Sequence, residues 1–319
     1  MSRQRFCLYL VMGENGVMEK EKGSRDDALL RRRLPDSICQ LTEGKTCTRE
    51  KTVLRGSELL IFDDCVLKIT PCSREDEESV QVMRWLEGKL PVPKVLACEK
   101  NKEYQYLLMS RIPGRKAWDD PCLAHPAELL AVLAEAVKAL WRVDVSDCPR
   151  TRDADTLLLK AKYNVENNRA DVHNVEPGTY GRGGFENPQA LLNWLYDNKP
   201  GFEPVLSHGD FCLSNILTEG GKLSGFIDLG ETGVGDRWRD LAMLIRSLQH
   251  NFDGRDDGKA DPDMLFDALG IEPDCKKLRF YALLDELFEG SAAGRRRSGK
   301  PSKIPPGIGL SHRNKEQIT

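Results

Sequence analysis

The sequence lacks the cysteine and histidine patterns that hold zinc or build disulfide scaffolds. Its ten cysteines include no Cys-x-x-Cys pair, and its five histidines do not cluster with them. This pattern favours a reducing, cytoplasmic setting. No apolar run is long enough to span a bilayer, and no convincing cleavage site follows the short apolar start. With 47 basic and 50 acidic residues, the overall charge attracts neither nucleic acid nor membranes, so we expect neither partner.

The chain is long enough for two lobes, and charged segments lie at both of its ends. We predict a charged extension at residues 1–34, a first lobe at 35–112, a second and larger lobe at 113–288, and a basic tail at 289–319. The tail has too few apolar residues to offset the entropy of ordering, and it has no aromatic residue on which bases could stack. We therefore expect a disordered tail that binds no nucleic acid.

The first lobe reads as antiparallel strands with one helix, and the second as mainly helical. The elements expected before the hinge at Pro113-Gly114 are a hairpin of Leu59–Phe62 and Cys65–Ile69, a helix at Arg74–Lys89, and paired strands at Val95–Glu99 and Tyr104–Ile112. The helices expected after it begin at His125 and continue with Leu157–Asn168, Pro188–Asp197, Asp236–Gln249, Asp263–Leu269 and Asp274–Phe288. This order predicts an α+β protein.

Three polar side chains stand at the ends of a further predicted hairpin. Two apolar runs flank the tight-turn sequence Glu-Gly-Gly-Lys at residues 219–222, and folding there brings Asp210 and Asn215 close to Asp228. Two carboxylates and an amide offer the hard oxygen ligands that Mg²⁺ prefers. Their spacing matches the kinase arrangement of a catalytic base, a metal-binding asparagine and a second metal-binding aspartate. We predict that Asp210 is the base and that Asn215 and Asp228 hold Mg²⁺.

A lysine and a glycine turn in the first lobe are candidate phosphate contacts. Lys68 stands among apolar neighbours on a predicted strand, where a cation needs an anionic partner such as a nucleotide phosphate. Gly44-Lys45-Thr46 suggests a P-loop, but that motif requires a glycine where Cys39 stands. We predict a turn between two strands that covers the phosphates with backbone N–H groups, with a plain hairpin turn as the alternative.

The strings around these residues resemble the aminoglycoside 3′-phosphotransferases, a family with a protein-kinase-like fold. The resemblance runs from about Thr42 to Phe288 and is carried by SHGDFCLSNIL, GFIDLGETGVGDRWRDLA, RWLEGKLPVPKVL, YLLMS, VDVSDCP and YALLDELF. It implies a two-lobed kinase-like fold and transfer of the γ-phosphoryl group of ATP or GTP to the 3′-hydroxyl of an aminoglycoside, which gives antibiotic resistance. We expect a monomer or a weak dimer.

The resemblance also implies roles for single positions. Asp210 matches the catalytic aspartate, and Asn215 and Asp228 match the Mg²⁺ ligands. The expected nucleotide contacts are Lys68, Thr46, Ser110, Ile112, Met109 and Ile227, with Glu78 or Glu75 bracing Lys68. Glu286 and Phe288 match residues that help to bind the drug. Glu176 and Glu231 are further acids of the kind that a cationic sugar needs.

Three departures from the family pattern affect the expected affinity and drug spectrum. The glutamate that should brace the lysine falls on Ser79, Val66 replaces an aromatic residue that can stack on adenine, and Glu231 replaces an arginine. Two alternatives therefore stay open: a kinase of another small alcohol, and a nucleotide-binding protein that has lost turnover. A protein kinase is not favoured, because His208-Gly209-Asp210 replaces His-Arg-Asp and no Ala-Pro-Glu segment follows.

Overall fold

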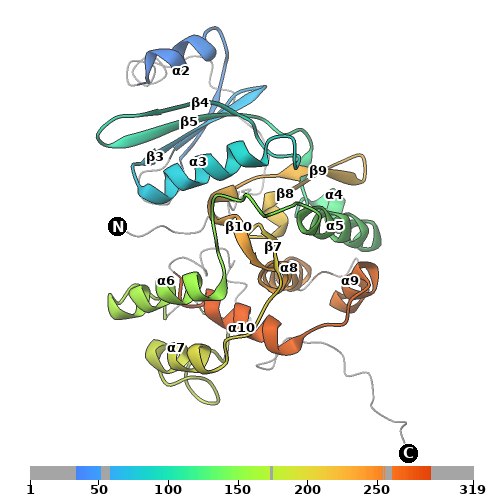
Figure 1. Cartoon of the computed structure of the whole chain (residues 1–319). Coiled ribbons are helices and arrows are strands. Elements are labelled where there is room, and N and C mark those ends of the chain that lie inside the picture. The colour runs from blue at the N-terminus through green and yellow to red at the C-terminus, as the bar shows by residue number, and fades with distance from the viewer. Residues whose placement is uncertain (1–33, 52–57, 173–174, 254, 256–260, 289–319) are drawn as a thin grey trace, which may run out of the picture.

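The computed structural model describes residues 34–51, 58–172, 175–253, 255 and 261–288, and it has two lobes (Figure 1). The predictions for the N-terminal extension and the basic tail lie outside the described residues, apart from Leu34. The two-lobed α+β, kinase-like architecture expected from the sequence is confirmed.

The N-terminal lobe is a five-stranded antiparallel sheet with the strand order β1-β2-β3-β5-β4. Its elements are α2 (Asp36–Leu41), β1 (Thr48–Lys51), β2 (Glu58–Ile61), β3 (Cys65–Pro71), α3 (Arg74–Leu86), β4 (Val95–Lys100) and β5 (Tyr104–Ser110). One face buries Leu67 and Leu108 together with Ile38 of α2. The opposite face carries Leu107, which belongs to the larger core shared with Val82 of α3.

Helix α3 has clear sequence-encoded ends. The Ser73 hydroxyl accepts a hydrogen bond from the Asp76 N–H at 3.3 Å, which caps the first turn. Acidic side chains at Glu75, Asp76 and Glu77 favour the positive end of the helix dipole. The helix ends at Leu86, and Gly88 follows with a φ of +77°, a conformation that favours glycine.

The C-terminal lobe combines helices with two small sheets, which lie between the N-terminal sheet and the lower helices in Figure 1. Its helices are α4 (Asp120–Leu123), α5 (Pro126–Trp141), α6 (Ala154–Glu166), α7 (Pro188–Asp197), α8 (Arg237–Phe252), α9 (Pro262–Leu269) and α10 (Cys275–Asp285). Its strands are β6 (Arg115–Lys116), β7 (Pro204–Ser207), β8 (Ile216–Glu219), β9 (Lys222–Phe226) and β10 (Gly233–Asp236), with short 3₁₀ turns η1 (Leu213–Asn215) and η2 (Leu229–Glu231).

The predicted β8–β9 hairpin is confirmed and shapes the site. Gly220 and Gly221 form the turn with φ values of +58° and +74°, which explains the two consecutive glycines. Ile216 pairs with Phe226, and the Ile227 N–H donates to the Asn215 carbonyl at 3.0 Å. The chain segments before and after the hairpin are thereby brought side by side. The neighbouring β7–β10 pair was not expected, because its short strands lack a clear alternating pattern.

The prediction that the turn at Gly44 joins two strands is wrong. The turn joins helix α2 to strand β1. The segment Ser37-Ile38-Cys39-Gln40-Leu41 offers only a single helical turn, too short to show helical periodicity in the sequence. The connection between β1 and β2, at residues 52–57, lies outside the described residues.

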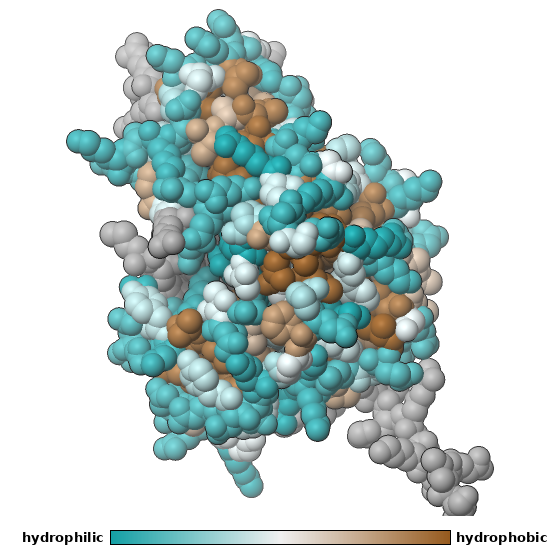
Figure 2. Space-filling view, viewed as in Figure 1, coloured by the Kyte–Doolittle hydropathy of each residue, from teal (hydrophilic) through white to brown (hydrophobic). Residues whose placement is uncertain are grey.

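The described surface is mixed in polarity. Figure 2 shows apolar residues in separate patches with hydrophilic residues between them. Among the helices within the described ranges, none has both the length and the apolar composition to cross a membrane.

Candidate active site

The loop that follows β7 is fixed by one buried carboxylate on α8. Asp240 accepts hydrogen bonds from the Ser207 hydroxyl at 3.0 Å and from the backbone N–H groups of His208 and Gly209, each at 2.8 Å. Asp240 is 1% exposed, and its burial raises the pKa of the carboxyl group. These three donors set the path of the chain as it reaches Asp210.

Position 209 requires glycine because its backbone has a positive φ and because there is no room for a Cβ atom. Its φ is +81°, and a Cβ atom there would lie 2.4 Å from the Glu231 carbonyl oxygen and 2.9 Å from an Arg239 guanidinium nitrogen. A side chain would push apart the two loops that meet at the site. This explains why the motif has glycine directly before Asp210.

His208 links the same two loops. Its Nε2 lies 3.0 Å from the Ile227 carbonyl oxygen, and its Nδ1 lies 3.4 Å from the Asp210 N–H. These partners fit a ring that donates from Nε2 and accepts at Nδ1. Complete burial lowers the pKa of His208 and keeps the ring neutral. The expectation that His208 orders the loop by hydrogen bonding agrees with these contacts.

The three predicted catalytic side chains come together at the end of the β8–β9 hairpin. The Asn215 Nδ2 donates to the Asp210 carbonyl oxygen at 2.9 Å and to its Oδ2 at 3.1 Å. On the other side of the hairpin, the Lys68 Nζ lies 3.5 Å from the Asp228 Oδ1. We call the segment between β7 and η1, residues 208–212, the catalytic loop. Residues 68, 210, 215 and 228 thus converge from β3, the catalytic loop, η1 and the segment after β9.

The oxygen ligands of Asn215 and Asp228 suit Mg²⁺, which is usually held partly by water and substrate phosphates. Among the described residues, no group of three or more His, Cys, Asp or Glu side chains could hold a metal ion. Asn215 and Asp228 supply two kinds of oxygen ligand, and Mg²⁺ usually completes its shell with water and substrate phosphates. The residues at the hairpin therefore fit a magnesium–nucleotide complex.

Comparisons with known proteins agree with this geometry. Residues 56–280 match the model of the phosphotransferase enzyme family abbreviated APH. An aminoglycoside 3′-phosphotransferase from Enterococcus faecalis is 40% identical over 253 residues, which cover 77% of this chain and 92% of the relative. A second one, from Staphylococcus aureus, is 39% identical over 218 residues, which cover 66% of this chain and 79% of the relative.

This chain belongs to the aminoglycoside 3′-phosphotransferase family. Solved structures support the same fold. The crystal structure of an aminoglycoside 3′-phosphotransferase of type VIII aligns with a TM-score of 0.66 at 26% identity, and the alignment covers 82% of this chain and 98% of that one. An aminoglycoside phosphotransferase from Streptomyces rimosus, solved with ADP and streptomycin, aligns with a TM-score of 0.64 at 24% identity and covers 80% and 99% of the two chains.

The family's expected adenine-pocket positions lie on one face of the N-terminal sheet. Val66 and Lys68 are two residues apart on β3, and Met109 is paired with Val66 across from β5. The Ser110 N–H donates to the Lys94 carbonyl at 2.9 Å, so any backbone contact between Ser110 and a purine involves its carbonyl oxygen.

The remaining two apolar positions, Ile112 and Ile227, lie near the place where β9 contacts Pro91. Gly225 of β9 lies so close to the linker that a Cβ atom there would be 2.4 Å from the Pro91 carbonyl oxygen and 3.0 Å from Ile112 Cγ2. The Phe226 N–H donates to the same Pro91 carbonyl at 2.9 Å, directly before Ile227. Both isoleucines thus lie at the junction expected for adenine.

Thr46 precedes β1, and the strand register places Glu50 of β1 in line with Lys68. Thr48 of β1 is paired with Ile61, at the end of β2 that turns into β3, whereas Lys68 is paired with Leu59. The adjacent Lys45 forms an ion pair with Asp64 of that turn at 2.7 Å. The phosphate-binding role of Thr46 stays a prediction, and this register does not favour it.

Glu231 is surrounded by cations, which sequence reasoning missed. Its carboxylate lies 2.9 Å from Lys160 Nζ, 3.7 Å from Arg152 and 3.6 Å from Arg239. We call these four residues the Glu231 cluster. Its members come from η2, α6, α8 and the segment before α6, so no local sequence pattern indicates them. Because Glu231 is buried and already neutralised, the geometry does not favour its predicted role in attracting a cationic substrate.

The helix α3 acids also have partners in the C-terminal lobe. Glu78 lies 3.8 Å from Arg152, and Glu75 lies 3.9 Å from Lys160. Ser79, at the position of the family glutamate, donates to the Glu75 carbonyl at 2.7 Å and accepts from Arg150 at 3.2 Å. Arginine and lysine side chains from the C-terminal lobe therefore reach α3 where the family pattern places a lysine–glutamate pair.

The predicted substrate acids Glu176 and Glu286 meet at one arginine. Arg246 lies 3.4 Å from each of these carboxylates and 3.1 Å from that of Asp285. Arg246 thus gathers three carboxylates in one place. Phe288 is buried nearby in the chain, with Lys160 Nζ 5.6 Å from the centre of its ring. Asp285 and Arg246 were not predicted as site residues.

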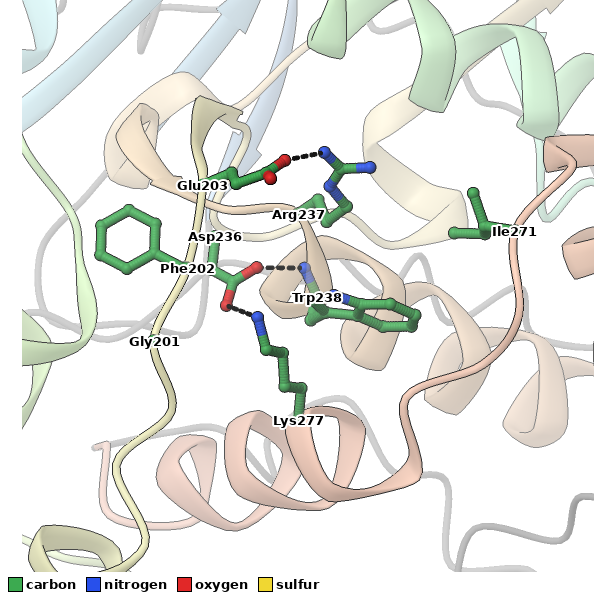
Figure 3. A pocket seen from close by; sticks show the side chains of 8 residues that line it. All are labelled: Gly201, Phe202, Glu203, Asp236, Arg237, Trp238, Ile271 and Lys277. Carbon is green, nitrogen blue, oxygen red and sulfur yellow. Dashed lines mark hydrogen bonds and ion pairs between the residues drawn. The ribbon is translucent and has the colours of Figure 1, made fainter.

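A separate hollow of about 400 Å³ lies at the other end of the β7–β10 pair (Figure 3). Its apolar lining includes Phe202, Trp238 and Ile271. Its charged side chains face one another: Arg237 pairs with Glu203 at 3.1 Å, and Lys277 with Asp236 at 3.7 Å. With these charges mutually neutralised, the hollow does not display the chemistry expected of the phosphoryl-transfer site.

Proposed function

We propose that this enzyme transfers the γ-phosphoryl group of ATP to the 3′-hydroxyl group of an aminoglycoside and thereby gives resistance to the drug. The observation that carries the proposal is the convergence of Lys68, Asp210, Asn215 and Asp228 at one hairpin. The relatives named as aminoglycoside 3′-phosphotransferases support the choice of substrate.

The nucleotide is held by residues from both lobes in this proposal. Lys68 would contact the α- and β-phosphates, while Asn215 and Asp228 would hold Mg²⁺. Bound Mg²⁺ would neutralise negative charge on the β- and γ-phosphates. Met109, Ser110, Ile112 and Ile227 border the base, with less stacking than an aromatic residue at position 66 would give.

Asp210 orients the attacking hydroxyl group and takes its proton. The substrate oxygen forms a bond to the γ-phosphorus while the bond from that phosphorus to the β–γ bridging oxygen breaks, and ADP leaves. Asn215 holds one Asp210 carboxylate oxygen at 3.1 Å, which limits rotation of the carboxylate. No covalent enzyme intermediate is needed, so Cys212, which is packed beside the loop, is not required as a nucleophile.

The aminoglycoside lies against the acidic group around Arg246. Glu176 is partly exposed, while Glu286 accepts a hydrogen bond from the Glu176 N–H at 3.2 Å. Carboxylates gathered in this way suit the amino groups of a polyamino sugar. We place the enzyme in the cytoplasm, as a monomer or weak dimer, where it meets its nucleotide and the drug.

The test is a panel of matched aminoglycosides with and without the 3′-hydroxyl group, assayed for ADP release with ATP and, separately, GTP. We expect release only with drugs that carry this hydroxyl, and mass spectrometry should find one added phosphoryl group. Equal release with both sets would overturn the 3′ assignment. Release with neutral alcohols in place of the drugs would instead indicate a kinase of another small alcohol.

A further inference from the structure

Arg150 occupies a buried position between the two lobes. It follows α5, and its backbone is fixed against β10: the Val234 N–H donates to the Arg150 carbonyl at 2.8 Å, and the Arg152 N–H donates to the Val234 carbonyl at 2.7 Å. The side chain is 5% exposed. A guanidinium group in such a place needs several acceptors.

The guanidinium group has three acceptors from two separate elements. Its Nε donates to the Thr232 carbonyl at 2.6 Å, and one terminal nitrogen donates to the Leu229 carbonyl at 3.0 Å. The other terminal nitrogen donates to the Ser79 hydroxyl of α3 at 3.2 Å. A planar fork with fixed N–H directions can hold these acceptors together in one arrangement.

The residue held by this fork directly follows the predicted metal ligand. Asp228 has a φ of +60°, a left-handed conformation that is uncommon for residues other than glycine, although aspartate adopts it more readily than most. Arg150 fixes the next carbonyl along the chain, that of Leu229, and the carbonyl of Thr232 just beyond η2. Arg150 therefore holds the chain directly after Asp228.

The third contact reaches the helix position where the family pattern places a glutamate. Here Ser79 replaces that residue, and its hydroxyl accepts from Arg150 while donating to the Glu75 carbonyl at 2.7 Å. Burial lowers the pKa of Arg150 to about 10, so the group remains a cation at neutral pH. Arg150 thus links α3 to the loop of Asp228, beside a longer direct contact of 3.4 Å from the Ser79 hydroxyl to the Gly230 carbonyl.

We propose that Arg150 is a positioning residue for phosphoryl transfer, which fixes the loop of Asp228 relative to α3 and so sets the affinity of the site for the magnesium–nucleotide complex. The inference rests on the proposed function and adds a residue that touches neither nucleotide nor drug. Removing the fork should weaken binding of Mg²⁺ with nucleotide and lower kcat, while the KM for the aminoglycoside changes little.

The experiment compares Arg150→Met, which keeps length without the donors, with Arg150→Lys and with Arg142→Met. Arg142 pairs with Glu135 on the exposed face of α5 and serves as the control. Isothermal titration measures ADP binding across a series of Mg²⁺ concentrations at a temperature where each variant is folded by circular dichroism. We expect Arg150→Met to raise the half-saturating Mg²⁺ concentration about 10-fold or more and to lower kcat by about 10- to 100-fold.

Arg150→Lys should recover only part of the loss, because an ammonium group lacks the planar fork. A lowered melting temperature with unchanged Mg²⁺ dependence and unchanged kcat would overturn the proposal and leave Arg150 with a purely structural role.

Ser79→Ala provides the test if Arg150→Met does not fold. It removes the acceptor on α3 together with the contacts of the hydroxyl group with the carbonyl oxygens of Glu75 at 2.7 Å and Gly230 at 3.4 Å, and we expect a shift of the Mg²⁺ dependence in the same direction by about 3-fold. An unchanged dependence would overturn the coupling to α3. Failure of the wild-type protein to phosphorylate any aminoglycoside would defeat the proposed function, whereas the ADP-binding measurements would still decide the role of Arg150.

Discussion

The catalytic loop and the Glu231 cluster lie next to each other but are held together in different ways. In the loop, one carboxylate, Asp240, gathers two backbone N–H groups and a hydroxyl group. In the Glu231 cluster, one carboxylate faces three cationic side chains from different elements. The first arrangement holds backbone groups of one short loop with a single side chain of α8, while the second joins charged side chains from several elements.

This difference indicates which residues can be substituted independently and which must change together. Backbone N–H groups are the same whatever side chain a residue carries. The catalytic loop can therefore keep its shape when neighbouring side chains are substituted. Charged side chains must change together, because a buried charge without its partner is destabilising. Ser79 and Glu231 each depart from the family pattern. In this protein Ser79 contacts Arg150, and Glu231 contacts Arg152 and Lys160.

The first prediction tests the backbone-held region through Asp240→Ala. The substitution leaves the N–H groups of His208 and Gly209 without their acceptor in a buried place, and each orphaned donor costs about 1–3 kcal/mol. We expect a loss of about 4 kcal/mol in the free energy of unfolding, measured by urea denaturation.

Asp147→Ala is the matched control for Asp240→Ala. Asp147 also accepts from two groups, Trp85 Nε1 and Lys89 Nζ, but it lies on the surface. We expect a loss below about 1 kcal/mol there. Equal losses in the two variants would contradict the special role of Asp240.

The second prediction tests the charge-held region through Glu231→Gln. The change keeps the side-chain size but leaves three cations facing a neutral amide. Breaking a buried ion pair by removing one partner typically costs about 3–5 kcal/mol, and we expect about 3 kcal/mol here because Lys160 is partly exposed.

Glu135→Gln is the control for Glu231→Gln, since Glu135 pairs with Arg142 at 3.0 Å in an exposed place. Its unfolding free energy should change by less than about 0.5 kcal/mol. A Glu231→Gln variant as stable as wild type would show that the cluster is not held by charge.

The third prediction concerns pH and has the smallest effect. The pKa of buried His208 is lowered, so the unfolded chain takes up a proton on this ring at a higher pH than the folded chain does. Stability should therefore fall as pH decreases below about 6.5, the ordinary pKa of histidine. Urea midpoints between pH 7.5 and pH 5.5 measure this slope.

His208→Asn should reduce that slope, whereas His125→Asn, at an exposed histidine, should leave it unchanged. The same slope in wild type and in His208→Asn would contradict a neutral, buried ring at this position.

The sequence predicted the parts of the fold that follow from short-range rules. The β8–β9 hairpin, helix α3 and the paired strands β4 and β5 agree with expectation, because turn glycines, a helix cap and apolar spacing are local signals. Helix α2 and the β7–β10 pair were missed, since each is short and depends on packing against the rest of the molecule.

The site was predictable to the same extent. Asp210, Asn215, Asp228 and Lys68 meet as expected, because one hairpin and one strand register bring them together. The pairing of Glu231 with Lys160 and the contacts of Arg150 were not predictable, since they join segments about 70 to 80 residues apart. The pairing of Glu176 and Glu286 with Arg246 was missed for the same reason.

The central claim is that Asp210 serves the attacking hydroxyl group while other residues bind the nucleotide. Asp210→Asn tests it directly, with ADP binding in Mg²⁺ followed by calorimetry and drug-dependent ADP release followed on the same preparation. The account predicts nucleotide affinity within about 3-fold of wild type and a kcat lowered by about 10³-fold or more. Turnover at the wild-type rate in this variant would contradict it.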